Sequence, residues 1–138
     1  MVSAEFACRA CGAEAGRVVM LDAGEVPPRL ADGFPSAGLL DDPRSRRLIV
    51  AGPVATASGP YEPKDARAWP ERALLAAIRG ADGAALFKMD PELAPFWCPE
   101  CEGAYCRTHW NKQTNFDDGF YDTTYGTCPR GHRRMLDD

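Results

Sequence analysis

The sequence predicts a small α+β domain in which close pairs of cysteine and histidine residues support a modest hydrophobic core. The chain of 138 residues is 45% apolar and 26% charged, as globular proteins are, but 13 glycines and 12 prolines divide it into short segments. Its six cysteines and two histidines all fall into four close pairs. Hydrophobic burial alone would leave such a chain marginally stable, so we expect the paired side chains to supply the remaining stability.

Short strands and turns are predicted through the first half of the chain. Residues 17–21 are largely apolar and follow a tight cysteine turn, so a strand is predicted there. A second strand is predicted over residues 47–51, and residues 54–56 are able to extend it. Residues 22–42 are rich in Pro, Gly and Asp and are predicted to form a loop, while residues 58–64 are predicted to be a turn.

The clearest helical pattern covers residues 70–79. A proline suits its first turn, apolar side chains recur along one face, and Gly80 is expected to end it. Residues 84–89 fit either a short helix capped by Asp82 or a strand. Residues 117–119, Asp-Asp-Gly, are typical of a tight turn. The prediction is therefore one main helix combined with short β-hairpins.

The spacing within the four pairs is typical of metal ligands. Two residues intervene in three of the pairs and three residues in the fourth, so a tight turn can aim both side chains at one ion. Four pairs complete two tetrahedral sites, and thiolate with imidazole is the usual donor set for zinc. We therefore predict two structural Zn²⁺ ions as cofactors. The predicted ligands are Cys8 with Cys11, Cys98 with Cys101, Cys106 with His109, and Cys128 with His132.

The pairs can share two ions in either of two ways. In a sequential scheme the first two pairs form an all-cysteine site and the last two form a site of two cysteines and two histidines. In an interleaved scheme, the cross-brace, the first pair joins the third and the second joins the fourth. The sequential scheme is favoured here, because the two cysteine knuckles are alike and would form a zinc ribbon around residues 96–97. The expected fold is thus a zinc-ribbon or treble-clef-like two-zinc module.

The ligand positions also suggest how the chain is organised. We expect a single domain over residues 1–138. Residues 1–21 would hold the first knuckle and a strand, residues 22–97 an inserted lobe, and residues 98–138 the main zinc-binding module. Eight ligands fill two tetrahedra and leave no open position, so no catalytic residue is predicted.

Composition limits the classes of function and the compartment. The chain has no apolar leader at its start and no run of 18 to 20 apolar residues, so neither a signal peptide nor a membrane span is predicted. A cytoplasmic location is expected, where paired cysteines are more often metal ligands than disulfides. The Ala, Arg, Gly and Asp bias suggests a bacterial source with high GC content. A net charge of −4 argues mildly against a general nucleic-acid binder.

Two further groups of side chains have alternative interpretations. Residues 116–125 contain four aromatics, which are expected to cover the metal and its thiolates, or alternatively to form a surface for a partner. Trp97 and Trp110 are expected in the core. Basic clusters at residues 44–47 and 130–134 are expected to be solvated faces, and alternatively contact nucleic acid.

The segment over residues 98–110, CPECEGAYCRTHW, resembles the CPxC half of in-between-RING modules and part of MYND-type fingers. The resemblance covers about a tenth of the chain and implies a zinc-ligand role for its three cysteines and for His109. The expected function is a non-enzymatic adaptor that binds another protein. Two alternatives remain, a nucleic-acid-binding zinc-ribbon protein and a RING-like component of a ubiquitin-type ligase.

Overall fold

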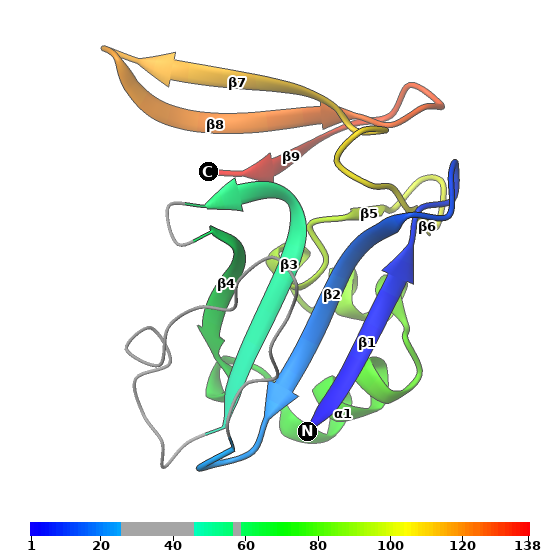
Figure 1. The fold of residues 1–138 in the computed structure, drawn as a ribbon, viewed down its shortest axis with the longest axis vertical. Helices are drawn as coiled ribbons and strands as arrows, with labels where there is room; N and C mark the ends of the chain where they lie inside the picture. The colour runs from blue at the N-terminus through cyan, green and yellow to red at the C-terminus, as the bar shows by residue number, and fades with distance from the viewer. Residues whose placement is uncertain (26–45, 57–58) are drawn as a thin grey trace.

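The computed structural model describes residues 1–25, 46–56 and 59–138, with the backbone alone for 55–56 and 59–63 (Figure 1). Within these residues the chain is a small α+β protein with three antiparallel sheets and two α-helices. Most of the predicted loop at 22–42 and the first two residues of the basic cluster at 44–47 lie outside the described residues. In the described part, no helix is long and apolar enough to cross a membrane.

A four-stranded antiparallel sheet forms the larger half of the molecule. Its strand order is β1-β2-β3-β4, so every neighbour in the sheet is also a neighbour along the chain. The strands are β1 (Val2–Ala7), β2 (Glu14–Leu21), β3 (Arg47–Thr56) and β4 (Gly59–Asp65). Strands β2 and β3 contain both predicted strands, and β3 includes the extension through residues 54–56.

Two predictions about this sheet were incomplete or wrong. Strand β1 was missed, although Ala4, Phe6 and Cys8 alternate as buried residues in the period-2 pattern of a strand. The segment 58–64 was predicted to be a turn, but β4 covers most of it. Pro60 and Pro63 suggested a turn, yet β4 is an edge strand, where prolines are tolerated because one side of the ladder needs no donor.

The helices cover one face of this sheet and complete the core. Helix α1 (Glu71–Arg79) ends at Gly80 as predicted, and α2 (Gly83–Met89) shows that residues 84–89 are helical. The Asp82 side chain caps α2 by accepting from the backbone N–H of Ala85 at 3.0 Å. Short 3₁₀ turns, η2 (Ala66–Ala68) and η3 (Pro91–Leu93), flank the two helices. Side chains from the sheet and both helices form one cluster, which includes Val18, Met20, Leu48, Val50, Leu74, Ile78 and Leu86.

The smaller half contains a short hairpin and a three-stranded sheet. The hairpin pairs β5 (Trp97–Cys98) with β6 (Gly103–Ala104). The sheet has the order β7-β8-β9, with β7 (Asn111–Asp117), β8 (Phe120–Thr127) and β9 (Arg133–Asp137). Figure 1 shows this sheet above the end of β3, with the β7–β8 hairpin reaching away from the helices.

The predicted turn at residues 117–119 lies at the tip of the β7–β8 hairpin. Asp118 and Gly119 both have positive φ, 49° and 82°, as a two-residue hairpin turn requires.

At the base of the hairpin, directly before β7, the Trp110 side chain is 1% exposed and donates its indole N–H to the Phe96 carbonyl at 3.3 Å. The expectation that Trp110 belongs to the core is therefore confirmed, whereas Trp97 is only partly buried against that core.

Candidate metal centre

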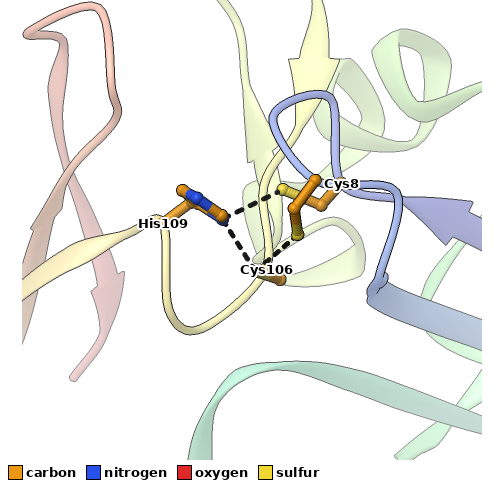
Figure 2. A group of neighbouring side chains, drawn as sticks. Cys8, Cys106 and His109 are labelled. Carbon is orange, nitrogen blue, oxygen red and sulfur yellow. Dashed lines mark hydrogen bonds between the residues drawn. The ribbon is translucent and has the colours of Figure 1, made fainter.

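The first group of ligand atoms joins the N-terminal cysteine turn to residues 106–109. Cys8 and Cys11 come from the turn between β1 and β2, and Cys106 and His109 come from the segment before β7. Figure 2 shows Cys8, Cys106 and His109 pointing toward one another. The His109 Nδ1 atom lies 3.6 Å from Cys8 Sγ and 3.2 Å from Cys106 Sγ. The Sγ atoms of Cys11 and Cys106 are 3.7 Å apart.

The second group has the same composition. Cys98 and Cys101 come from the β5–β6 turn, and Cys128 and His132 come from the turn between β8 and β9. The His132 Nδ1 atom lies 3.7, 3.2 and 3.4 Å from the sulfurs of the three cysteines, in chain order. The Sγ atoms of Cys101 and Cys128 are 3.7 Å apart. Each group therefore offers three thiols and one imidazole around a common centre.

These separations fit a tetrahedral metal ion. With Zn–S near 2.3 Å and Zn–N near 2.0 Å, ligand atoms at tetrahedral angles lie about 3.5–3.8 Å from one another. The contacts within the two groups range from 3.2 to 3.7 Å, and all four ligand atoms of each group lie within 4.8 Å of one another. The structure thus brings all eight predicted ligands together in two Cys₃His groups at metal-binding distance.

The grouping is interleaved, so the preference for a sequential scheme was wrong. The first pair meets the third and the second meets the fourth. The likeness of the two cysteine knuckles was a poor guide, because local sequence shapes each turn but does not determine which turns meet. Tertiary packing determines which turns meet. The first knuckle lies against β6, where the Arg9 backbone N–H donates to the Ala104 carbonyl at 2.9 Å.

Tight turns hold each pair, as the knuckle pattern predicts. In the first turn the Gly12 N–H donates to the Cys8 carbonyl at 2.8 Å, with Gly12 at φ 77°. In the last turn the His132 N–H points at the Cys128 sulfur at 3.4 Å, and in the second the Cys101 N–H points at the Cys98 sulfur at 3.5 Å. Such N–H groups stabilise thiolate charge.

The surroundings adjust the pKa values of these thiols in different directions. Burial raises the pKa of Cys98 to about 11. Burial also acts to raise the pKa of Cys101, but hydrogen bonds from the side chains of Tyr105 and His132 outweigh it and lower that pKa to about 7. The pKa values of Cys8 and Cys106 are lowered, because hydrogen bonds from backbone N–H groups outweigh the effect of burial. Because metals bind the thiolate form, the lowered pKa values of Cys8, Cys101 and Cys106 favour cation binding, whereas the pKa values of Cys11 and Cys98 are raised.

Two residues that sequence reasoning missed connect the two groups. Arg9, inside the first knuckle, donates its guanidinium to the Cys101 carbonyl inside the second. Tyr105 lies between Cys101 and Cys106, donates its backbone N–H to Phe96 at 3.0 Å, and its side chain hydrogen-bonds the Cys101 thiol. The only sequence signal for Tyr105 is its place between ligands of different groups, and Arg9 has no signal beyond its place between two cysteines.

The ligands differ in how far solvent reaches them. Five of the cysteines are buried, whereas Cys11 is exposed, and both histidines are partly buried. The outward Nε2 atom of His132 lies 3.6 Å from a carboxylate oxygen of Glu100, a partner of the kind that orients metal-binding imidazoles.

The aromatic residues near the last ligands do not cover the metal groups. Phe116, Phe120 and Tyr121 are 67%, 77% and 45% exposed on the outer part of the β7–β8 hairpin. The expectation that residues 116–125 shield the metal was therefore wrong for these three. The hairpin carries them outward because its tip extends beyond the four-stranded sheet (Figure 1).

Four arginines of the basic clusters have partners within the chain, whereas Arg130 is exposed. Arg46 pairs with Asp22 and Glu71, and Arg47 donates to the carbonyl of Glu25. In the second cluster, the Arg133 guanidinium lies 3.9 Å from the centre of the Tyr125 ring. Arg134 donates to two backbone carbonyls, at 3.0 and 2.6 Å. These side chains are less available to phosphates than a solvated cluster would be.

The fold and its two Cys₃His groups define a small α+β domain arranged around paired turns that could hold two metal ions. Residues 1–138 match the model of a family described as a domain of unknown function (DUF8328), and the chain belongs to this family. Comparison with curated proteins and with solved structures gives no match. The resemblance of residues 98–110 to in-between-RING and MYND-type fingers remains local.

Proposed function

We propose that this chain is a zinc-stabilised protein-interaction module, in which each Cys₃His group holds one structural Zn²⁺ ion. Three thiolates and one imidazole are a usual donor set for structural zinc, and four protein ligands leave no position for water or substrate. The sulfur and nitrogen separations of 3.2 to 3.7 Å support this assignment. Because all six cysteines belong to the two groups, none is left to act as a nucleophile.

The observation that carries the interaction function is the exposed aromatic tip, which we define as Phe116, Phe120 and Tyr121. Exposed aromatics on a rigid support are typical anchors of protein interfaces. The Phe116 and Tyr121 rings pack edge to face at 6.5 Å, and the Tyr121 hydroxyl donates to Asp137 at 2.6 Å. The tip is therefore partly ordered before a partner binds, which lowers the entropic cost of binding.

The metal groups support this hairpin from both ends. Strand β7 begins two residues after His109, a ligand of the first group, and β8 ends one residue before Cys128, a ligand of the second. The base of the aromatic tip is thus attached to two separate metal centres. This arrangement gives the zinc ions a role in presenting the tip as well as in folding.

Nucleic-acid binding is the less favoured alternative. The turn of the hairpin and its flank carry Asp117, Asp118 and Asp122, all exposed, which would repel phosphates from the aromatic rings. A RING-like ligase component is the other alternative, and transfer of a ubiquitin-like protein in a reconstituted assay would identify it.

Native mass spectrometry tests the metal assignment. The protein as purified is expected to carry two Zn²⁺ ions, and Cys106→Ser and Cys128→Ser, one in each group, are each expected to lose one ion. Loss of both ions from either variant would show that the groups fill together. Absence of metal from the wild-type protein would refute the assignment.

Photo-crosslinking tests the interaction function. The full chain, carrying p-benzoylphenylalanine in place of Phe120, is irradiated in cells of its source organism, and the adduct is identified by mass spectrometry. The matched control carries the same group in place of Lys88, which is also exposed but lies on α2. One protein is expected to crosslink from position 120 and not from position 88.

A competition experiment then measures the interaction with the purified partner. Excess wild-type chain is expected to suppress the adduct, and a Phe116→Ser/Phe120→Ser competitor is expected to be at least about tenfold less effective, because hot-spot aromatics contribute about 2 kcal/mol or more each. Equal crosslinking from both positions, or adducts with nucleic acid alone, would refute the proposal.

A further inference from the structure

A groove lies between the two halves of the molecule, and its lining residue Asp137 accepts a hydrogen bond from Tyr121 of the aromatic tip. It has a volume of about 500 Å³ and is bordered by the end of β3, the α2–η3 segment and β9. Apolar groups form much of its lining, and they include Val50, Val54, Phe87, Pro91, Pro95, Met135 and Leu136. A groove of this size accommodates several side chains of a bound segment.

The rim of the groove is strongly acidic. Four carboxylates line it, against a single guanidinium among the described lining residues. Asp90 and Glu92 come from the η3 side, and Asp137 and Asp138 come from the β9 side. Carboxylates on both sides of an apolar floor favour a ligand that carries positive charge next to apolar groups.

The one guanidinium belongs to the wall and does not neutralise the rim. Arg134 is partly buried, and burial lowers its pKa to about 10, so it stays charged at neutral pH. Its Nη1 atom donates to the carbonyls of Ala94 and Trp97, at 3.0 and 2.6 Å, and its guanidinium lies 5.0 Å from the centre of the Phe87 ring. Arg134 therefore joins β9 to the η3 segment and fixes the width of the groove.

The acidic groups are fixed to different degrees. Asp90 caps η3 by accepting from the Glu92 N–H at 2.9 Å, and Asp137 accepts from the Tyr121 hydroxyl. Glu92 lies 3.4 Å from the Lys64 ammonium, while its own side chain is 64% exposed. Asp138 is exposed. Glu92 and Asp138, on opposite sides, are thus the carboxylates that can meet a ligand at least structural cost.

We propose that this groove binds a basic segment of a partner protein, in which lysine or arginine residues alternate with apolar ones. The apolar side chains would lie on the floor, and the cationic ends would reach the carboxylates on both rims. A second copy of this chain is a poor occupant, because its aromatic tip carries three aspartates of the same sign. Nucleic acid is excluded by the same charge. The inference rests on the proposed interaction function and names the chemistry of a partner at a second surface.

Selection from a random dodecapeptide library on the zinc-loaded full chain tests this inference. The enriched peptides are expected to contain several Lys or Arg residues interspersed with Leu, Ile, Val or Phe. The best peptide is then labelled, and its affinity is measured by fluorescence anisotropy at low and at moderate salt, with weaker binding expected at the higher salt. No enrichment, or enrichment of acidic or purely apolar peptides, would overturn the proposal.

Matched variants locate the binding site. Glu92→Gln/Asp138→Asn removes one charge from each rim and is expected to weaken binding roughly tenfold. The control Glu5→Gln/Glu102→Gln removes two exposed charges that do not line the groove, and its affinity is expected to equal that of the wild type. Equal weakening in both variants would attribute binding to net charge and overturn the proposal.

The two proposals fail separately. Phe116→Ser/Phe120→Ser is expected to bind the selected peptide with unchanged affinity, although it loses the crosslinked partner. A groove variant that keeps full peptide affinity refutes the inference and leaves the interaction function of the aromatic tip intact. Zinc content and circular dichroism of each variant confirm that the fold is retained.

Discussion

The four-stranded sheet and the three-stranded sheet are stabilised in different ways. In β2 nearly every residue after Glu14 is buried, and the helices pack on one face of that sheet. In β7 no residue is buried, and β8 and β9 together bury Thr124, Gly126 and Leu136. The first sheet is held by apolar packing, while the second buries few side chains and is joined at its base to the two Cys₃His groups.

This difference shows how the chain can expose aromatic residues on a hairpin. An isolated hairpin is marginally stable in water, and a small sheet needs an apolar face for independent stability. The three-stranded sheet has little such face, and under the proposed zinc assignment two ions at its base would compensate for the missing core. The residues on the outer surface of this sheet are then not required for folding and are available for binding.

Among the changes that test this difference between the two sheets, removal of the metal should have the largest effect on stability. Chelation is expected to unfold the chain, with hydrogen-exchange protection lost first in β7–β9, because structural zinc contributes on the order of 10 kcal/mol per site. Circular dichroism and region-resolved hydrogen exchange measure the two effects. An unchanged spectrum after complete zinc removal would show that the apolar core suffices for both halves.

Two core truncations, one in each half of the molecule, compare the contribution of each half to stability and to zinc binding. Trp110→Ala is expected to cost about 3–5 kcal/mol and to weaken zinc binding, because Trp110 directly follows His109 and is 1% exposed. Leu74→Ala, in α1, is expected to cost about 2–5 kcal/mol without changing zinc affinity in the folded protein. Urea denaturation and competition with a zinc chelator report on each. Equal loss of zinc affinity in both variants would contradict the division.

A smaller effect is expected from added volume in the second sheet. In Gly126→Ala the new Cβ atom would lie 2.5 Å from Leu136 Cδ1 and 3.0 Å from Trp110 Cε3. Such overpacking costs about 1–3 kcal/mol. Gly80→Ala is the milder comparison, because its Cβ atom would lie 3.3 Å from the Ala76 carbonyl oxygen and its φ of −85° suits alanine. Thermal unfolding should show the larger loss of Tm for Gly126→Ala.

The smallest effect on stability is expected at the aromatic tip. Phe120→Ser should change the free energy of unfolding by less than about 0.5 kcal/mol, because the Phe120 side chain is 77% exposed. Phe6→Ser, at a side chain 6% exposed and stacked on Phe96 at 4.4 Å, should destabilise the chain by several kcal/mol. A large loss of stability in Phe120→Ser would mean that the tip is structural.

Features that depend on neighbouring residues could be predicted from the sequence. The four ligand pairs, the cap at Asp82, the end of α1 at Gly80 and the hairpin turn at residues 117–119 each follow from a local pattern. These patterns act through backbone geometry and the hydrogen bonds of adjacent residues, so no tertiary information is needed. The candidate ligands could therefore be listed before their arrangement was known.

Features that depend on distant contacts could not be predicted in this way. Spacing within a pair does not state which pairs converge, and the interleaved grouping emerges only when β6 lies against the first knuckle. The exposure of Phe116 and Phe120 likewise depends on where the hairpin points. Strand β4 was not predicted because it contains prolines, and prolines are compatible with a strand only at positions such as the edge of a sheet.

The interleaved grouping also has a consequence for biosynthesis. The first group is complete only after residue 109 has been made, and the second only after residue 132. A nascent chain therefore leaves the ribosome with Cys8 and Cys11 unligated by their partners until most of the sequence has been translated.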